Sequence, residues 1–80
     1  MAHIKQERRK KEMLQNRDYP ATIIVKSTRF SKAKNSMVVA RLMQEYDLSL
    51  EEAAGALGIA IAHQQLTRYI ASDGTKCVKA

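Results

Sequence analysis

Apolar residues recur at helical spacing through the second half of the chain. Four of them mark one face of a helix expected over about residues 31–46: Val39, Leu42, Met43 and Tyr46. Four more mark a helix over residues 50–57: Leu50, Ala53, Ala54 and Leu57. Ser49 and Glu52 have the spacing of a capping box, which fixes where the second helix begins. Gly58 is expected to end it, because glycine takes a left-handed C′ conformation at little steric cost.

Two further elements are predicted on either side of this pair. A third helix beginning near Ala62 would bury a set of apolar residues at helical spacing: Ala62, Leu66, Tyr69 and Ile70. Nearer the N-terminus, residues 21–28 follow Pro20 and form a short segment rich in β-branched side chains, which favours a strand. No second strand is evident, so we expect this one to lie on the helices or to pair with another chain.

The residues around Gly58 carry a family resemblance. Ala54 stands four positions before Gly58, and the apolar Leu57 and Ile59 flank it. In this respect residues 48–70 resemble helix-turn-helix DNA-binding modules, which implies a helix pair whose second helix enters a DNA groove. The second half departs from the pattern, since Gln64 and Thr67 are polar where it has apolar residues, and a turn about two residues longer than usual would accommodate them. The predicted fold class is mainly α: a small three-helix domain with a helix-turn-helix-like pair, and a single N-terminal β-strand as a further candidate element.

Eighty residues are enough for one small domain with a modest core. We expect a basic, flexible arm over residues 1–17, the helical domain over 18–72, and a flexible tail over 73–80. The order of a strand followed by two helices is also similar to that of ribbon-helix-helix repressors. Because the strand of that family pairs across a dimer axis, this similarity makes a homodimer a candidate.

Positive charge is concentrated in the first half of the chain. The net charge is +6, and residues 1–34 contain ten Lys and Arg against three acidic residues. Residues 35–72 contain two Arg against four acidic residues, so the predicted helix pair is itself acidic. Since phosphate contacts supply most of the affinity of DNA-binding proteins, the pair would depend on cations elsewhere in the chain or in a second subunit.

The candidate nucleic-acid-binding residues form three groups. The first comprises the basic residues of the arm: Arg8, Arg9, Lys10 and Lys11. The second is a basic patch near the first predicted helix, where phosphates would bind: Arg29, Lys32 and Lys34. The third is the outer face of the predicted third helix, where Gln and Arg could contact adenine and guanine: Gln64, Thr67 and Arg68.

The sequence offers no catalytic, metal or cofactor site. Glu51 and Glu52 are explained by the first turn of a helix, and no Ser or Cys has a recognisable base partner. Cys77 is the single cysteine, so no internal disulfide can form and a reducing, cytoplasmic setting is expected. No apolar run is long enough to cross a bilayer, and we expect no membrane association.

The leading hypothesis is a non-enzymatic DNA-binding regulator or accessory factor. Its helix-turn-helix-like pair would contact duplex DNA, and its basic arm would contact phosphates. The alternative is a protein-binding adaptor or inhibitor that acts through its strand or its acidic helical face. RNA binding through the arm is a third hypothesis.

Overall fold

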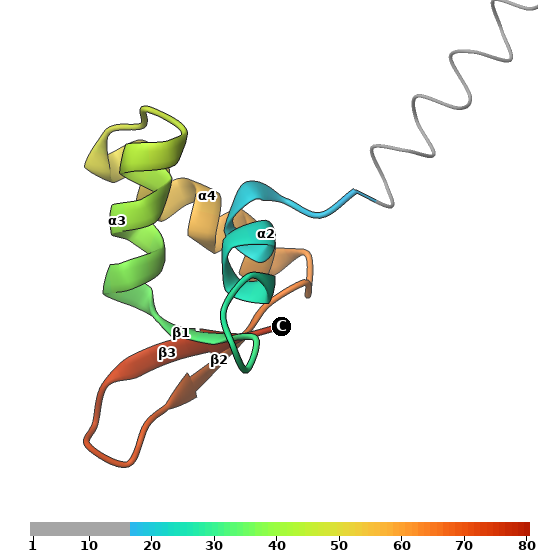
Figure 1. The fold of residues 1–80 in the computed structure, drawn as a ribbon, viewed down its shortest axis with the longest axis vertical. Helices are drawn as coiled ribbons and strands as arrows, with labels where there is room; N and C mark the ends of the chain where they lie inside the picture. Colours follow the sequence, from blue (N-terminus) through green and yellow to red (C-terminus); the bar gives the residue numbers. More distant parts are fainter. Residues whose placement is uncertain (1–16) are drawn as a thin grey trace, which may run out of the picture.

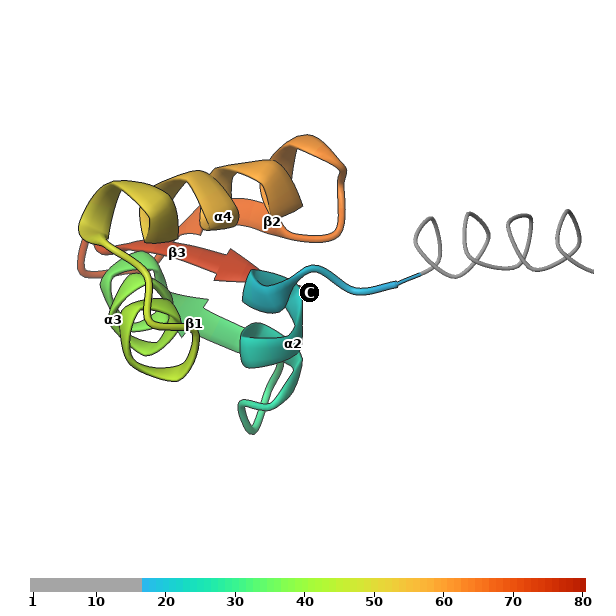
Figure 2. The same cartoon turned by 90° about the horizontal axis from the view of Figure 1, so that it is seen from above.

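The computed structural model describes residues 17–80, which form an α+β domain. In chain order the elements are helix α2 (Pro20–Lys26), strand β1 (Lys32–Lys34), helices α3 (Asn35–Glu45) and α4 (Leu50–Ala62), and strands β2 (Thr67–Ile70) and β3 (Lys76–Lys79). Figure 1 shows these helices on one side of the sheet, and Figure 2 shows the same arrangement from above. The mainly α prediction is wrong, because an antiparallel sheet of order β1-β3-β2 forms one layer of the domain.

The C-terminal strand β3 lies at the centre of the sheet. It pairs antiparallel with β1, where Ala33 lies opposite Val78, and with β2, where Arg68 lies opposite Val78. Val78 is fully buried and Ala33 is nearly so, because both face the helices. The segment expected to be a tail therefore supplies the strand that joins the two edges of the sheet.

Residues 21–28, predicted to form a strand, belong mainly to helix α2, which ends at Lys26. Pro20 occupies the first turn, where its missing N–H costs nothing. Ala21, Ile24 and Val25 fall at i, i+3 and i+4 and are buried against α3 and α4. Fully burying a side chain such as Ile or Val contributes roughly 1.5–3 kcal/mol, more than the few tenths lost from helix propensity. Two of the expected interfaces required a strand at residues 21–28: addition to a partner's sheet and pairing of two copies. The structure has no strand there to form either.

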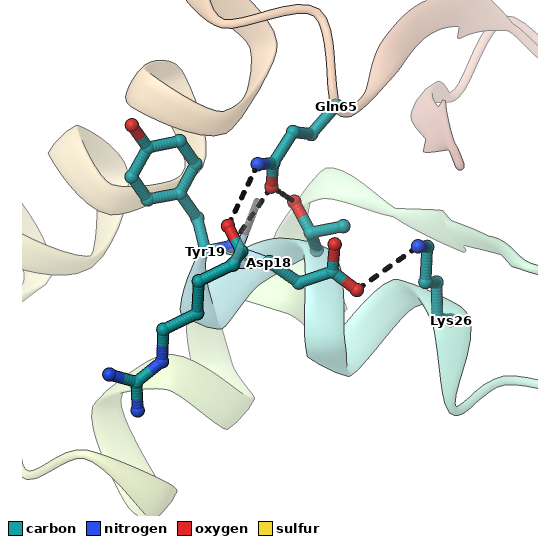
Figure 3. Close-up of polar contacts among 6 residues, drawn as sticks. Asp18, Tyr19, Lys26 and Gln65 are labelled. Atoms are coloured by element: carbon teal, nitrogen blue, oxygen red, sulfur yellow. Dashed lines mark hydrogen bonds and ion pairs between the residues drawn. The ribbon is translucent and has the colours of Figure 1, made fainter. Parts of the chain in front are cut away.

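The start of α2 is held by Gln65, which lies far away in sequence (Figure 3). Its Oε1 accepts hydrogen bonds from the Tyr19 backbone N–H at 2.9 Å and from Thr22 Oγ1 at 2.7 Å. Its Nε2 donates to the Arg17 carbonyl oxygen at 3.1 Å. Thr22 is the buried polar residue of the core, so Gln65 satisfies a hydroxyl that water cannot reach.

Helix α4 begins as predicted but does not end at Gly58. The capping box is confirmed: Ser49 Oγ accepts from the Glu52 N–H at 3.1 Å, and Glu52 Oε1 accepts from the Ser49 N–H at 2.9 Å. The helix continues to Ala62 because this buries Ala60. It ends at the C-cap His63.

The stop signal of α4 is a Schellman motif built on Gln64. This residue takes a left-handed conformation with φ 62°, and its N–H donates to the Ile61 carbonyl at 2.9 Å. The Gln65 N–H donates to the Ala60 carbonyl at 3.0 Å. The chain therefore reverses where the sequence pattern predicts the start of a third helix.

The predicted third helix is replaced by the β2–β3 hairpin. Of the apolar residues expected to pack on that helix, Leu66 is buried, whereas Ile70 is 64 % exposed. Gly74 has φ 88° in the hairpin turn, where Asp73 Oδ1 accepts from the Thr75 N–H at 3.0 Å. Pairing with β3 satisfies the backbone groups of residues 67–70 that point towards it, and β2 forms an edge of the sheet.

Candidate nucleic-acid interface

The side of the sheet that faces away from the helices is basic. Because side chains alternate along a strand, the neighbours of the inward-facing Ala33 and Val78 point outwards. The register places Lys32, Lys79 and Thr67 in one row and Lys34, Cys77 and Tyr69 in the next. We call Lys32, Lys34, Tyr69 and Lys79 the basic sheet face. Its three lysines are exposed and Tyr69 is half-buried.

Tyr69 is the aromatic centre of the basic sheet face. The ammonium nitrogens of Lys32 and Lys79 lie 5.9 and 5.8 Å from the centroid of its ring. The pKa of the Tyr69 phenol is raised, first by its partial removal from water and then by the neighbouring Cys77 thiol. The phenol is therefore neutral at physiological pH, and the face keeps the positive charge of its lysines.

Within residues 17–80, none of the cations of this face is bound in an ion pair. The ion pairs of this part of the chain join Lys26 of α2 to Asp18, just before that helix, at 3.0 Å, and Arg41 to Glu45 within α3 at 2.6 Å. One carboxylate lies near enough to the basic sheet face to be affected by its charge, that of Asp73. The pKa of Asp73 is lowered mainly by hydrogen bonds from Thr75 and further by the charge of Lys34. The lysines of the sheet are thus available to a negatively charged ligand.

A second exposed aromatic residue lies in the loop beside the strand ends. Phe30 is 74 % exposed in the loop before β1, and the guanidinium carbon of Arg29 lies 5.5 Å from its ring centroid. The loop is fixed to the sheet because the Ala80 N–H donates to the Ser31 carbonyl at 2.9 Å. Arg29 and Phe30 therefore lie beside the C-terminal end of β3, next to Lys32 and Lys79.

Four of the six acidic residues in residues 17–80 lie at the other end of the domain. Glu45, Asp47, Glu51 and Glu52 surround the turn from α3 to α4, far from the sheet in Figure 1. Helix α4 contains no Lys or Arg. Charge is therefore distributed unevenly over the domain: the end with the α3–α4 turn is acidic and the sheet is basic.

The structure brings together only some of the residues singled out in the sequence. Lys32, Lys34 and Thr67 share the outer side of the sheet, and Arg29 lies in the adjoining loop. Arg68 instead lines a groove between the hairpin and α4, and Gln64 forms the turn after α4. The candidates in the arm, Arg8, Arg9, Lys10 and Lys11, lie outside the described residues.

Tyr69 and Lys79 belong to the basic sheet face, although the sequence does not single them out. The sequence pattern places Tyr69 on the buried side of a third helix and Lys79 in a tail. The available signal was the sequence Lys76-Cys77-Val78-Lys79, in which apolar residues lie between lysines. Four residues are too few to distinguish a strand from a tail without knowledge of the partner strands.

Searches of protein-family models, curated proteins and solved structures find no significant match to this chain. Within residues 17–80, no three His, Cys, Asp or Glu side chains cluster in a way that could hold a metal ion. None of the helices described here is long and apolar enough to cross a membrane. The functional argument therefore depends on the basic sheet face.

Proposed function

We propose that this protein binds single-stranded nucleic acid on its basic sheet face. The observation that carries the proposal is the placement of Lys32 and Lys79 around Tyr69, with Lys34 on the same side of the sheet. Lysine ammonium groups bind backbone phosphates, and aromatic rings stack on unpaired bases. Phe30 is a second exposed ring, in the loop whose backbone is bonded to the end of β3.

The charge distribution favours a single strand over docking of a helix in a duplex groove. Helices α3 and α4, joined by residues 46–49 and followed by the β2–β3 hairpin, are the consecutive helices that could act as a helix-turn-helix pair, instead of the pair expected over residues 48–70. The second helix of that pair would bring Glu51 and Glu52 towards the phosphates and provides no cation. The residues expected to contact bases do not lie on one helix: Gln64 is in the turn after α4, and Thr67 and Arg68 are in strand β2. They therefore cannot act together as the outer face of a recognition helix.

The proposal is tested by measuring anisotropy of labelled oligonucleotides with the full chain. One sequence is used as single-stranded RNA, as single-stranded DNA and as a DNA duplex, between about 50 and 200 mM salt. We expect at least one single strand to bind several-fold more tightly than the duplex at each salt concentration. The basic arm cannot produce this preference by charge alone, because duplex DNA has the higher charge density. Tighter duplex binding, or no binding at the lowest salt, would refute the proposal.

A further inference from the structure

Strand β2 is an open edge of the sheet. It pairs with β3 on one side, and no strand of residues 17–80 pairs with it on the other. The Ala71 N–H donates to the Thr75 carbonyl at 2.9 Å, so these two residues form a hydrogen-bonded pair of the hairpin. Because hydrogen-bonded and non-hydrogen-bonded pairs alternate along an antiparallel ladder, the backbone N–H and C=O groups of Arg68 and Ile70 point away from β3. These backbone groups face the open edge.

Nothing within β2 blocks the addition of another strand. The strand contains no proline, and its register with β3 runs without a bulge. Its last residue, Ile70, is 64 % exposed. An extended peptide can add to such an edge through main-chain hydrogen bonds, while pockets for alternate side chains select its sequence.

A groove beside this edge could receive those side chains. Figure 2 shows α4 lying over β2, and the groove between them has a volume of about 470 Å³. Ala54 and Gly58 line it from α4, and Arg68 and Ile70 line it from β2. Arg68 lies opposite the inward-facing Val78, so alternate side chains of β2 point to the helix side of the sheet. A strand paired antiparallel with Arg68 and Ile70 directs its own alternate side chains to the same side.

The charges of the groove favour an acidic occupant. Arg68 and Lys76 line it and are in no ion pair within residues 17–80, and no acidic side chain lines it. The side-chain oxygen of Asn35, which also lines the groove, is buried and has no hydrogen-bond donor. The arm does not suit this groove, because residues 1–16 contain five Lys and Arg against two Glu.

We propose that the edge of β2 and this groove bind an extended acidic segment of a partner protein. The segment adds antiparallel to β2 as a fourth strand and forms backbone hydrogen bonds with Arg68 and Ile70. A carboxylate opposite Arg68 pairs with the guanidinium, and an apolar side chain two residues away lies opposite Ile70. The inference does not depend on the proposed function, because it uses none of the lysines of the basic sheet face.

The probe is a fluorescent peptide of about ten residues, long enough to span β2. Every second residue is threonine, and the positions between alternate glutamate with valine, so that glutamate can face Arg68 while valine faces Ile70. Anisotropy with the full, nuclease-treated chain should show saturable binding that weakens with salt. N-methylation of the glutamate and valine residues should abolish binding, whereas N-methylation of the threonines should not, because their N–H groups point away from β2. A peptide with lysine in place of glutamate should not bind.

Variants of the chain test the two parts of the site separately. Ile70→Pro removes an outward N–H without removing a bond to β3, so the domain should stay folded while peptide affinity falls about tenfold or more. Ile70→Val keeps the N–H and is the control. Arg68→Glu should lower the affinity about fivefold or more, because it places like charges opposite each other. Arg17→Glu makes the same change of charge outside the groove and should bind like the parent.

Absence of saturable peptide binding would overturn the inference. Equal affinity for the two N-methylated peptides would also overturn it, and this comparison uses the unaltered chain. Undiminished binding to Arg68→Glu would place the peptide on another surface. Self-association of the chain that Ile70→Pro abolishes would show that a second copy occupies the edge, which contradicts the proposal as well.

Discussion

The ammonium nitrogen of Lys79 lies 5.8 Å from the centroid of the Tyr69 ring, and the two residues come from neighbouring strands. Lys32 approaches the same ring from β1, on the far side of β3, at 5.9 Å. Side chains of all three strands therefore meet at one aromatic ring. The ring is neutral and does not neutralise the positive charge of the two lysines. The lysines can therefore attract anions.

Removing an aromatic ring should weaken single-strand binding more than duplex binding. Each base stacked on an aromatic side chain contributes roughly 1–3 kcal/mol, so Phe30→Ser should lower single-strand affinity about fivefold or more. Tyr69→Leu should act in the same direction. Neither change removes a cation, so the slope of affinity against salt should stay constant in the anisotropy titration. An equal loss for duplex and single strand would argue against stacking.

Loss of the Gln65 side chain should destabilise the domain. Gln65→Ala removes the acceptor of the Thr22 hydroxyl and of the Tyr19 N–H, and we expect the free energy of unfolding to fall by about 2 kcal/mol. Thr22→Val removes the other partner of the shorter bond. The double variant should lose less than the sum of the single losses, since both changes remove one interaction. Urea unfolding of the four proteins measures this coupling, and additive losses would contradict it.

The left-handed residue Gln64 should be better replaced by glycine. A non-glycine residue in this conformation costs roughly 1–2 kcal/mol, so Gln64→Gly should raise the free energy of unfolding by up to about 1 kcal/mol. Gly74→Ala provides the converse comparison, because φ 88° suits only glycine, and should destabilise by about 1 kcal/mol. Thermal melting of both variants would show shifts of opposite sign. A destabilised Gln64→Gly variant would mean that the side chain itself contributes.

Low pH should weaken two local interactions that stabilise the fold, those of the Glu52 and Asp73 carboxylates. The pKa of Glu52 is lowered by hydrogen bonds with the Ser49 backbone and side chain, and that of Asp73 by hydrogen bonds from Thr75. Because these values are lowered by folding, their stabilising effect is complete above the unfolded-state pKa values, about 3.9–4.3, and is lost as pH falls through the folded-state values.

Substitution of the capping residue separates the contribution of the helix cap. Ser49→Ala should cost about 1 kcal/mol near neutral pH and should flatten the loss of stability below about pH 4.5. Urea unfolding of the parent and of Ser49→Ala as a function of pH measures both effects. An unchanged pH profile in Ser49→Ala would exclude the cap as a source of acid sensitivity.

Local signals predicted the start of α4 because both members of the capping box lie within one turn. Its end was mispredicted because Gly58 looked like a stop, whereas the burial of Ala60 carries the helix further. Residues 21–28 were mispredicted because their β-branched side chains favour a strand, although the spacing of Ala21, Ile24 and Val25 also fits a helix. Tertiary burial decided between the two.

The candidate site was harder to predict than the helices. Lys32 and Lys34 stood out by their charge, but their face depends on pairing with residues more than forty positions later in the chain. Tyr69 has the spacing of a buried helix residue, so only the strand register reveals that it faces outwards. The alternation of a three- or four-residue strand gives too weak a signal to place such residues.

The most direct test of the account is to remove the charge of the basic sheet face in the full chain. In Lys32→Gln/Lys34→Gln/Lys79→Gln, loss of three phosphate contacts should reduce the slope of log affinity against log salt by about 2 for a single strand. The matched control, Arg17→Gln/Lys26→Gln/Arg41→Gln, removes the same net charge from the helical side and should leave the slope nearly unchanged. Equal slopes for the two triple variants would place binding elsewhere and contradict the account.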